Sequence, residues 1–153
     1  MNSSPLEKFY HWEKTAPDIV FLRQPIEGRW REYSYAQAGK EIRGIAAALK
    51  ALAFDPGSNI AILSKNCAHW IMADLAIWMA GHVSIPIYPS LSGSAVRYVL
   101  EHSEAKAIFI GKLDDYGKQK SGIPESIVKI SFPEYGPNEG LLWDQLLREL
   151  AHE

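Results

Sequence analysis

The stretch NIAILSKNCAHWIMADLAIWMAGHVSIPIYP, residues 59–89, decides the fold. Residues 59–64 form a short apolar run between turn signals, which predicts a strand buried on both faces. Residues 67–80 are apolar nearly all round, which predicts a helix that the rest of the protein covers on most sides. Residues 83–88 predict a second strand, so the stretch as a whole predicts a strand–helix–strand unit.

Three residues in this stretch have predicted local roles. Asn66 is placed to cap the helix by accepting hydrogen bonds from its first free N–H groups. Gly81 is expected to end the same helix in the left-handed conformation. Pro86 cannot donate to a β-ladder, so it marks an edge, an end or a bulge of the second strand.

The alternation of strands and helices continues along the chain. Before the unit, Ser34 and Gln37 fit a capping box that opens a helix over residues 35–53. After it, we expect a helix to about residue 102, strands at 107–110 and 127–130, and an amphipathic helix over 141–150. Residues 112–124 are expected to form a loop. Strands that alternate with helices imply right-handed crossovers and a parallel sheet.

The N-terminal part has a different pattern. A short helix is expected over residues 5–14, followed by strands at 19–22 and 30–33 that would pair as a β-hairpin. The turn around residues 27–29 is expected to be longer than two residues. The sequence thus predicts one α/β domain over residues 1–153, with an N-terminal β-hairpin plus a mostly parallel sheet with flanking helices.

Composition excludes several classes of function. The chain has 153 residues, of which 47% are hydrophobic and 22% charged, as in an ordinary globular domain. Its net charge of −2 gives no electrostatic reason to expect nucleic-acid binding. Cys67 is the single cysteine and has no disulfide partner in the chain, which favours a reducing compartment. We expect neither a signal peptide at the N-terminus nor a transmembrane segment, because the longest apolar run is shorter than the ~20 residues of a span.

No catalytic constellation or metal-ligand spacing is apparent in the sequence. The glycines do not form a phosphate-binding loop, and the five histidines are scattered. Cys67 follows Lys65 at a predicted helix start, which suits either a reactive thiolate or, as we prefer, a small buried residue. Asp74 is either an acid/base group or an interface contact, and we prefer the contact. Asp114 and Asp115 together are read as a solvated turn.

Three segments together resemble a known family. They are REYSYAQAGKEIRGIAAALKALAFDPGSNIAILSKN (31–66), HWIMADLAIWMAGHVSIPIYPSLSGSAVRYVLEHSEAKAIFIG (69–111) and LLWDQLLREL (141–150). They resemble the N-terminal region of AMP-forming acyl-CoA synthetases of the adenylate-forming superfamily, most closely the long-chain fatty-acid–CoA ligases. The resemblance implies that residues 1–153 are the N-terminal part of the AMP-binding large domain. The catalytic core and C-terminal domain have no counterpart in these residues.

The resemblance also implies a reaction for the parent enzyme. A fatty acid and ATP, with Mg²⁺, give an acyl-adenylate and pyrophosphate, and CoA then displaces AMP to give acyl-CoA. This chain alone is expected to be inactive and to bind no cofactor tightly. The implied partners are the remainder of its own enzyme chain and, in the parent, the fatty acid, with a homodimer as a further option. The implied location is cytoplasmic, peripheral to a membrane in the parent.

The resemblance further suggests which residues could approach CoA. By their position after the strand at 107–110, Lys112, Lys118 and Lys120 are candidates for contacting CoA phosphates, and the alternative is that they are solvated loop lysines. Two other functions stay open. The chain could be a stand-alone binding or regulatory module that has lost the active site, or an unrelated flavodoxin-like domain with a nucleotide at its switch point.

Overall fold

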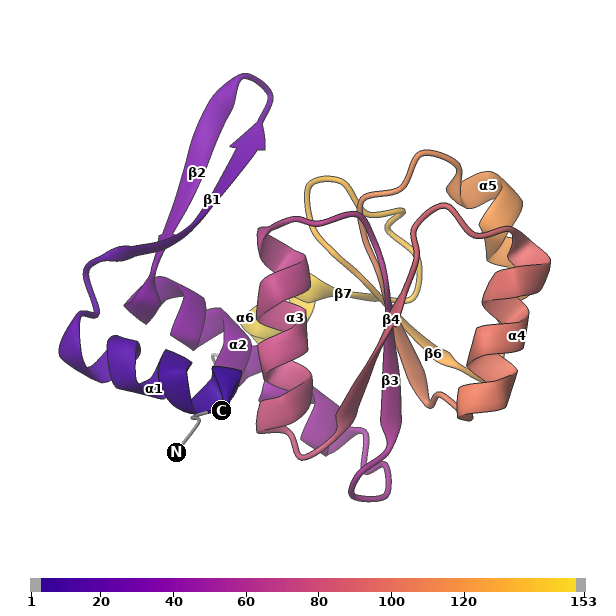
Figure 1. Ribbon diagram of the computed structural model, residues 1–153, viewed down its shortest axis with the longest axis horizontal. Coiled ribbons are helices and arrows are strands. Elements are labelled where there is room, and N and C mark those ends of the chain that lie inside the picture. The colour runs from indigo at the N-terminus through magenta and orange to yellow at the C-terminus, as the bar shows by residue number, and fades with distance from the viewer. Residues whose placement is uncertain (1–3, 151–153) are drawn as a thin grey trace.

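The computed structural model describes residues 4–150 and contains a two-stranded antiparallel hairpin and a five-stranded parallel sheet (Figure 1). The strands are β1 (Val20–Ile26), β2 (Arg29–Ser34), β3 (Asn59–Leu63), β4 (Val83–Ile87), β5 (Ala107–Ile110), β6 (Val128–Ser131) and β7 (Leu141–Leu142). The helices are α1 (Pro5–Thr15), α2 (Tyr35–Ala51), α3 (Ala68–Met79), α4 (Gly93–Ser103), α5 (Tyr116–Gln119) and α6 (Trp143–Leu150), with a 3₁₀ turn at Lys120–Gly122. The predicted α/β class and parallel sheet are confirmed.

Strand β3 lies between β4 and β5 in the larger sheet, whose strand order is β4-β3-β5-β6-β7. Side chains alternate between the two faces of a strand, so its residues enter two separate cores. Ile60 and Ile62 pack with residues of α2, α3 and α6, whereas Ala61 and Leu63 pack with residues of α4. All four side chains are fully buried, which explains the uninterrupted apolar run.

The two strands that follow β3 in the chain lie on opposite sides of it in the sheet. It passes from β3 through α3 to β4 on one side, and then through α4 to β5 on the other side of β3. Both pairings of β3 are parallel. The loops that leave the carboxyl ends of β3 and β5 therefore diverge, and such a switch point is the usual ligand position in open α/β sheets.

Strand β4 forms one edge of the sheet, which is one of the three positions predicted from Pro86. The Val83 N–H donates toward β3, to the Ser58 carbonyl at 2.9 Å. Because alternate residues of a parallel strand bond in opposite directions, Pro86 has its missing N–H on the open side. Gly81 ends α3 with a φ of +84°, which also agrees with the prediction.

The predicted hairpin forms, but the expectation of a longer turn was wrong. Ile26 pairs with Arg29, so the loop contains only Glu27 and Gly28. Both loop residues have positive φ, 49° and 77°, as in the two-residue turns that match the right-handed twist of paired strands. Glu27 is not one of the residues that usually signal such a turn, which is why the sequence pattern did not reveal it.

The predicted cap of α3 was also wrong. Asn66 is exposed, and Cys67 occupies the cap position without a side-chain hydrogen bond. The Ala68 N–H instead donates to Oε1 of Gln24, a buried residue of β1, at 2.8 Å. The hairpin therefore supplies the acceptor that the start of α3 needs.

The remaining differences are local. The capping box of Ser34 and Gln37 is present, but α2 ends at Ala51, two residues before the predicted end. The predicted loop at 112–124 contains α5 and the 3₁₀ turn, and the predicted helix at 141–150 begins with the short strand β7. Short elements of this kind carry too few residues to show a periodic pattern.

Candidate functional site

A groove of about 400 Å³ lies at the carboxyl ends of β3, β4 and β5. Its residues come from the loop after β3, the connection from β4 to α4, and the loop and short helix after β5. We call it the carboxyl-end groove; it is lined by Lys65, Pro89, Ser90, Leu91, Ser92, Gly93, Asp114, Asp115, Lys118 and Gln119. The groove therefore lies where the topology of the sheet predicts a ligand site.

Each lysine of the groove has a carboxylate as partner. Lys65 Nζ is 2.5 Å from Asp114 Oδ1, and Lys118 Nζ is 3.5 Å from Asp115 Oδ2. Ion pairs of such exposed groups contribute little to stability, because water and salt screen them. The groove lining therefore carries two positive and two negative charges, and an anion that binds the ammonium groups has to displace the two carboxylates.

One wall of the groove is fixed by a buried amide. Gln119 Nε2 donates to the carbonyls of Pro89 at 2.9 Å and of Leu91 at 2.8 Å. At Gly93, a Cβ atom would lie 2.8 Å from the Lys118 carbonyl oxygen, so only glycine allows this close approach without a shift of backbone. The start of α4 is thus packed directly against α5.

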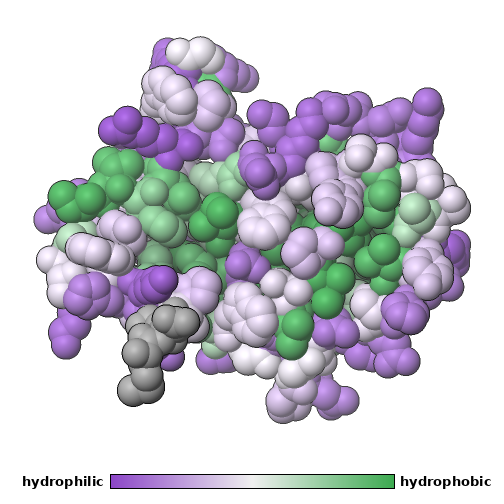
Figure 2. All heavy atoms as spheres, viewed as in Figure 1, coloured by the Kyte–Doolittle hydropathy of each residue, from purple (hydrophilic) through white to green (hydrophobic). Residues whose placement is uncertain are grey.

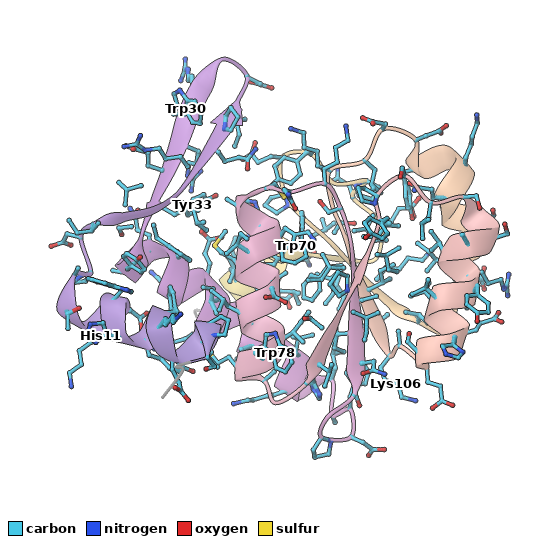
Figure 3. The ribbon with its side chains drawn as sticks, viewed as in Figure 1. His11, Trp30, Tyr33, Trp70, Trp78 and Lys106 are labelled. Atoms are coloured by element: carbon cyan, nitrogen blue, oxygen red, sulfur yellow. The ribbon has the colours of Figure 1, made fainter. Side chains whose placement is uncertain are left out.

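An aromatic depression of about 310 Å³ adjoins the groove and shares Pro89 with it. It is lined in part by Asn66, Trp70 and Tyr88. Tyr88 has 78% of its surface exposed, and Trp70 lies on α3 close to the start of that helix (Figure 3). An exposed aromatic ring in a depression that adjoins a lysine-bearing groove is suited to a ligand that combines a planar ring with negative charge.

The structure does not bring the three predicted lysines together. Lys118 lines the groove, whereas Lys120 lines a separate depression and lies 4.0 Å from Glu139. The side chain of Lys112 is exposed and lines neither. The role of these lysines toward CoA stays a prediction, and Lys118 is the best placed. Sequence reasoning missed Lys65 as a site residue because its partner Asp114 is 49 positions away.

Cys67 and His69 lie in a buried polar cluster behind the groove. Cys67 Sγ is 3.8 Å from Ser64 Oγ, and His69 Nδ1 is 2.5 Å from the Tyr135 hydroxyl. Burial lowers the pKa of His69 to about 4. Burial also raises the pKa of Tyr135, so the phenol keeps its proton and the imidazole is neutral at physiological pH. Aromatic rings surround the imidazole on several sides, and these contacts are those of a core residue.

Residues 4–150 offer neither a metal cluster nor a membrane-spanning helix. No group of three or more His, Cys, Asp or Glu side chains in this range is placed to hold a metal ion. Among the helices of the same range, none is long and apolar enough to cross a membrane.

Sequence comparison identifies related proteins. The family described as AMP-binding enzyme matches residues 9–145. The long-chain-fatty-acid–CoA ligase FadD15 of Mycobacterium bovis is 35% identical over 100 residues, which cover 65% of this chain and 17% of that protein. The long chain acyl-CoA synthetase 1 of Arabidopsis thaliana is 34% identical over 77 residues, or 50% of this chain and 12% of that protein. The chain thus spans only a small part of the length of these relatives.

Solved structures share the fold. Acetoacetyl-CoA synthetase from Streptomyces lividans superposes with a TM-score of 0.80 at 20% identity, covering 93% of this chain and 24% of that one. The N-terminal subdomain of NpsA from Klebsiella oxytoca superposes with a TM-score of 0.67 at 17% identity, covering 95% of this chain and 32% of that one. At these identities the agreement concerns the architecture of the chain.

The buried imidazole makes stability depend on pH. Because the folded-state pKa of His69, about 4, lies below its ordinary value of 6.5, the unfolded chain binds the extra proton between these values. The contribution of the neutral His69 to the free energy of unfolding is complete above about pH 6.5. It falls as the pH drops toward 4, by at most about 3 kcal/mol. Urea unfolding at pH 7.5 and pH 5 should show this loss. The His69→Gln variant should lose most of the difference, whereas a His102→Gln control, at an exposed position, should keep it.

Proposed function

Because the chain belongs to the AMP-binding enzyme family, we propose that it is the N-terminal scaffold portion of a long-chain fatty-acid–CoA ligase. The observation that carries the proposal is the similarity of this chain to such ligases. The similar region covers most of this chain but only a small fraction of each ligase. In the parent reaction, a fatty acid and ATP would form an acyl-adenylate and pyrophosphate. CoA would then displace AMP to give the acyl-CoA thioester.

In this proposal, residues 1–153 form the first part of the large AMP-binding domain. They supply a rigid parallel sheet and the loops at its carboxyl end, and the adenylation chemistry, with its ATP and Mg²⁺, belongs to other parts of the parent enzyme. The buried state of His69 and Cys67 supports a structural role for the two side chains that are otherwise best suited to catalysis.

The carboxyl-end groove is proposed to receive the nucleotide part of CoA. The ammonium groups of Lys65 and Lys118 would pair with its phosphates, because lysine binds phosphate as a point charge. The exposed ring of Tyr88 would contact the adenine face. The volume of the groove lies within the usual range for small-ligand sites.

The remainder of the parent chain is proposed to cover an apolar face. On α3, Ile71 and Trp78 have 37% and 46% of their surface exposed. Figure 2 shows hydrophobic residues at the surface of this side of the molecule. Contiguous exposed apolar patches commonly mark an interaction surface. In isolation, the same face would favour association with a second copy.

The scaffold role predicts that the 153-residue chain does not catalyse adenylation. With palmitate, Mg²⁺ and ATP, we expect no exchange of labelled pyrophosphate into ATP above the background without enzyme. A complete ligase of the same family serves as the positive control. Palmitate-dependent exchange by the chain itself would contradict the scaffold role.

The proposed CoA site predicts a difference between two neighbouring lysines. Lys118→Ala should weaken CoA binding about fivefold, because one phosphate contact at an exposed position is worth about 1 kcal/mol. Lys120→Ala is the matched control and should leave the affinity unchanged, since Lys120 lies in the other depression. Isothermal titration of CoA into both variants measures the effect, and equal losses would count against the groove as the site.

The apolar face predicts concentration-dependent self-association through α3. Sedimentation velocity should show larger species as the protein concentration rises. Trp78→Gln should reduce them because it removes an apolar side chain from this face. Trp30→Gln is the control, as Trp30 is also exposed (68%) but lies near the tip of the hairpin (Figure 3). A monomer at all concentrations, or an equal effect of both variants, would refute this role of the face.

A further inference from the structure

Ser64 joins the two loops that leave the sheet at its switch point. It is the first residue after β3 and has only 3% of its surface exposed. Its Oγ accepts a hydrogen bond from the Lys112 N–H at 2.8 Å and donates one to the Lys65 carbonyl at 2.8 Å. One hydroxyl therefore links the backbone after β3 with the backbone after β5.

The backbone completes the same connection. The Lys65 N–H donates to the Lys112 carbonyl at 2.8 Å, and the Gly111 N–H donates to the Leu63 carbonyl at 3.0 Å. We call these bonds, together with those of Ser64, the Ser64 clamp. The clamp needs a close approach at Gly111, where a Cβ atom would lie 2.5 Å from Ser64 Oγ.

The Ser64 hydroxyl hydrogen decides the direction of any hydrogen bond to the neighbouring thiol of Cys67. The Ser64 hydroxyl has one hydrogen, and the Lys65 carbonyl receives it. In any hydrogen bond across the 3.8 Å between Ser64 Oγ and Cys67 Sγ, the thiol is consequently the donor. The Cys67 thiol thereby adds a weak contact to the clamp.

We infer that Ser64 is a positioning residue for the carboxyl-end groove. The clamp fixes the backbone of Lys65, whose ammonium faces Asp114 across the groove. Without the hydroxyl, the Lys112 N–H loses its acceptor, and the loops after β3 and β5 lose the side chain that couples them. The inference rests on the proposed binding of CoA in this groove, and it assigns to Ser64 an effect on affinity without contact with the ligand.

Ser131 offers a matched control within the same chain. It ends β6, has 1% of its surface exposed, donates to the Glu139 carbonyl at 2.7 Å and accepts from the Glu139 N–H at 3.0 Å. It thus makes the same pair of bonds as Ser64, but to a residue that does not line the carboxyl-end groove. Ser64→Ala and Ser131→Ala remove equivalent interactions, and their midpoints of urea unfolding should fall by similar amounts.

The test combines amide exchange with CoA titration on the 153-residue chain. Ser64→Ala should increase hydrogen exchange at the Lys65 and Lys112 amides about tenfold and weaken CoA binding about fivefold, whereas Ser131→Ala should change neither.

The inference fails if both variants have the same effects, or if Ser64→Ala speeds exchange but leaves the affinity unchanged. Rapid hydrogen exchange of the Lys112 amide in the wild-type chain would refute the clamp, and this measurement does not require that Ser64→Ala folds. If the wild-type chain protects the Lys112 amide but does not bind CoA, the proposed CoA site is refuted. The positioning role of Ser64 then fails as well, whereas the clamp itself stands.

Discussion

The burial of β3 on both faces is the constraint on which the other parts of the structure depend. A strand with no polar side has to be covered twice, so helices α2, α3 and α6 lie on one face of the sheet and α4 lies on the other. This double cover requires crossovers on both sides of β3, and the crossovers create the switch point. The groove, the lysine–carboxylate pairs and the Ser64 clamp all lie at the loops that this arrangement brings together.

The parts of the fold that follow from local patterns could be predicted from the sequence. The apolar runs at 59–64 and 107–110, the helices between them and the edge position of Pro86 all depend on properties of neighbouring residues. Some errors are local, such as the turn length at Glu27 and Gly28, and others concern partners that are distant in the chain. Gln24 caps a helix that begins 44 residues later, and no local pattern distinguishes it from the expected cap, Asn66.

The candidate site was less predictable than the fold for the same reason. Its positive charges were expected among the lysines after β5. The groove is lined by only one of these, Lys118, together with Lys65 from the loop after β3. That combination depends on β3 and β5 being adjacent, which the order of elements suggests but does not establish. Ser64, which has no chemical signature in the sequence, gains its importance only from its position between two strand ends.

The proline in the edge strand also limits how the sheet can be extended. On the open side of β4, Pro86 has no N–H to donate. A further strand that paired with β4 there would therefore make very few consecutive hydrogen bonds. Whatever covers this edge has to do so mainly through side chains, as a helix or loop does. The same interruption disfavours edge-to-edge pairing of β4 with the strand of another molecule.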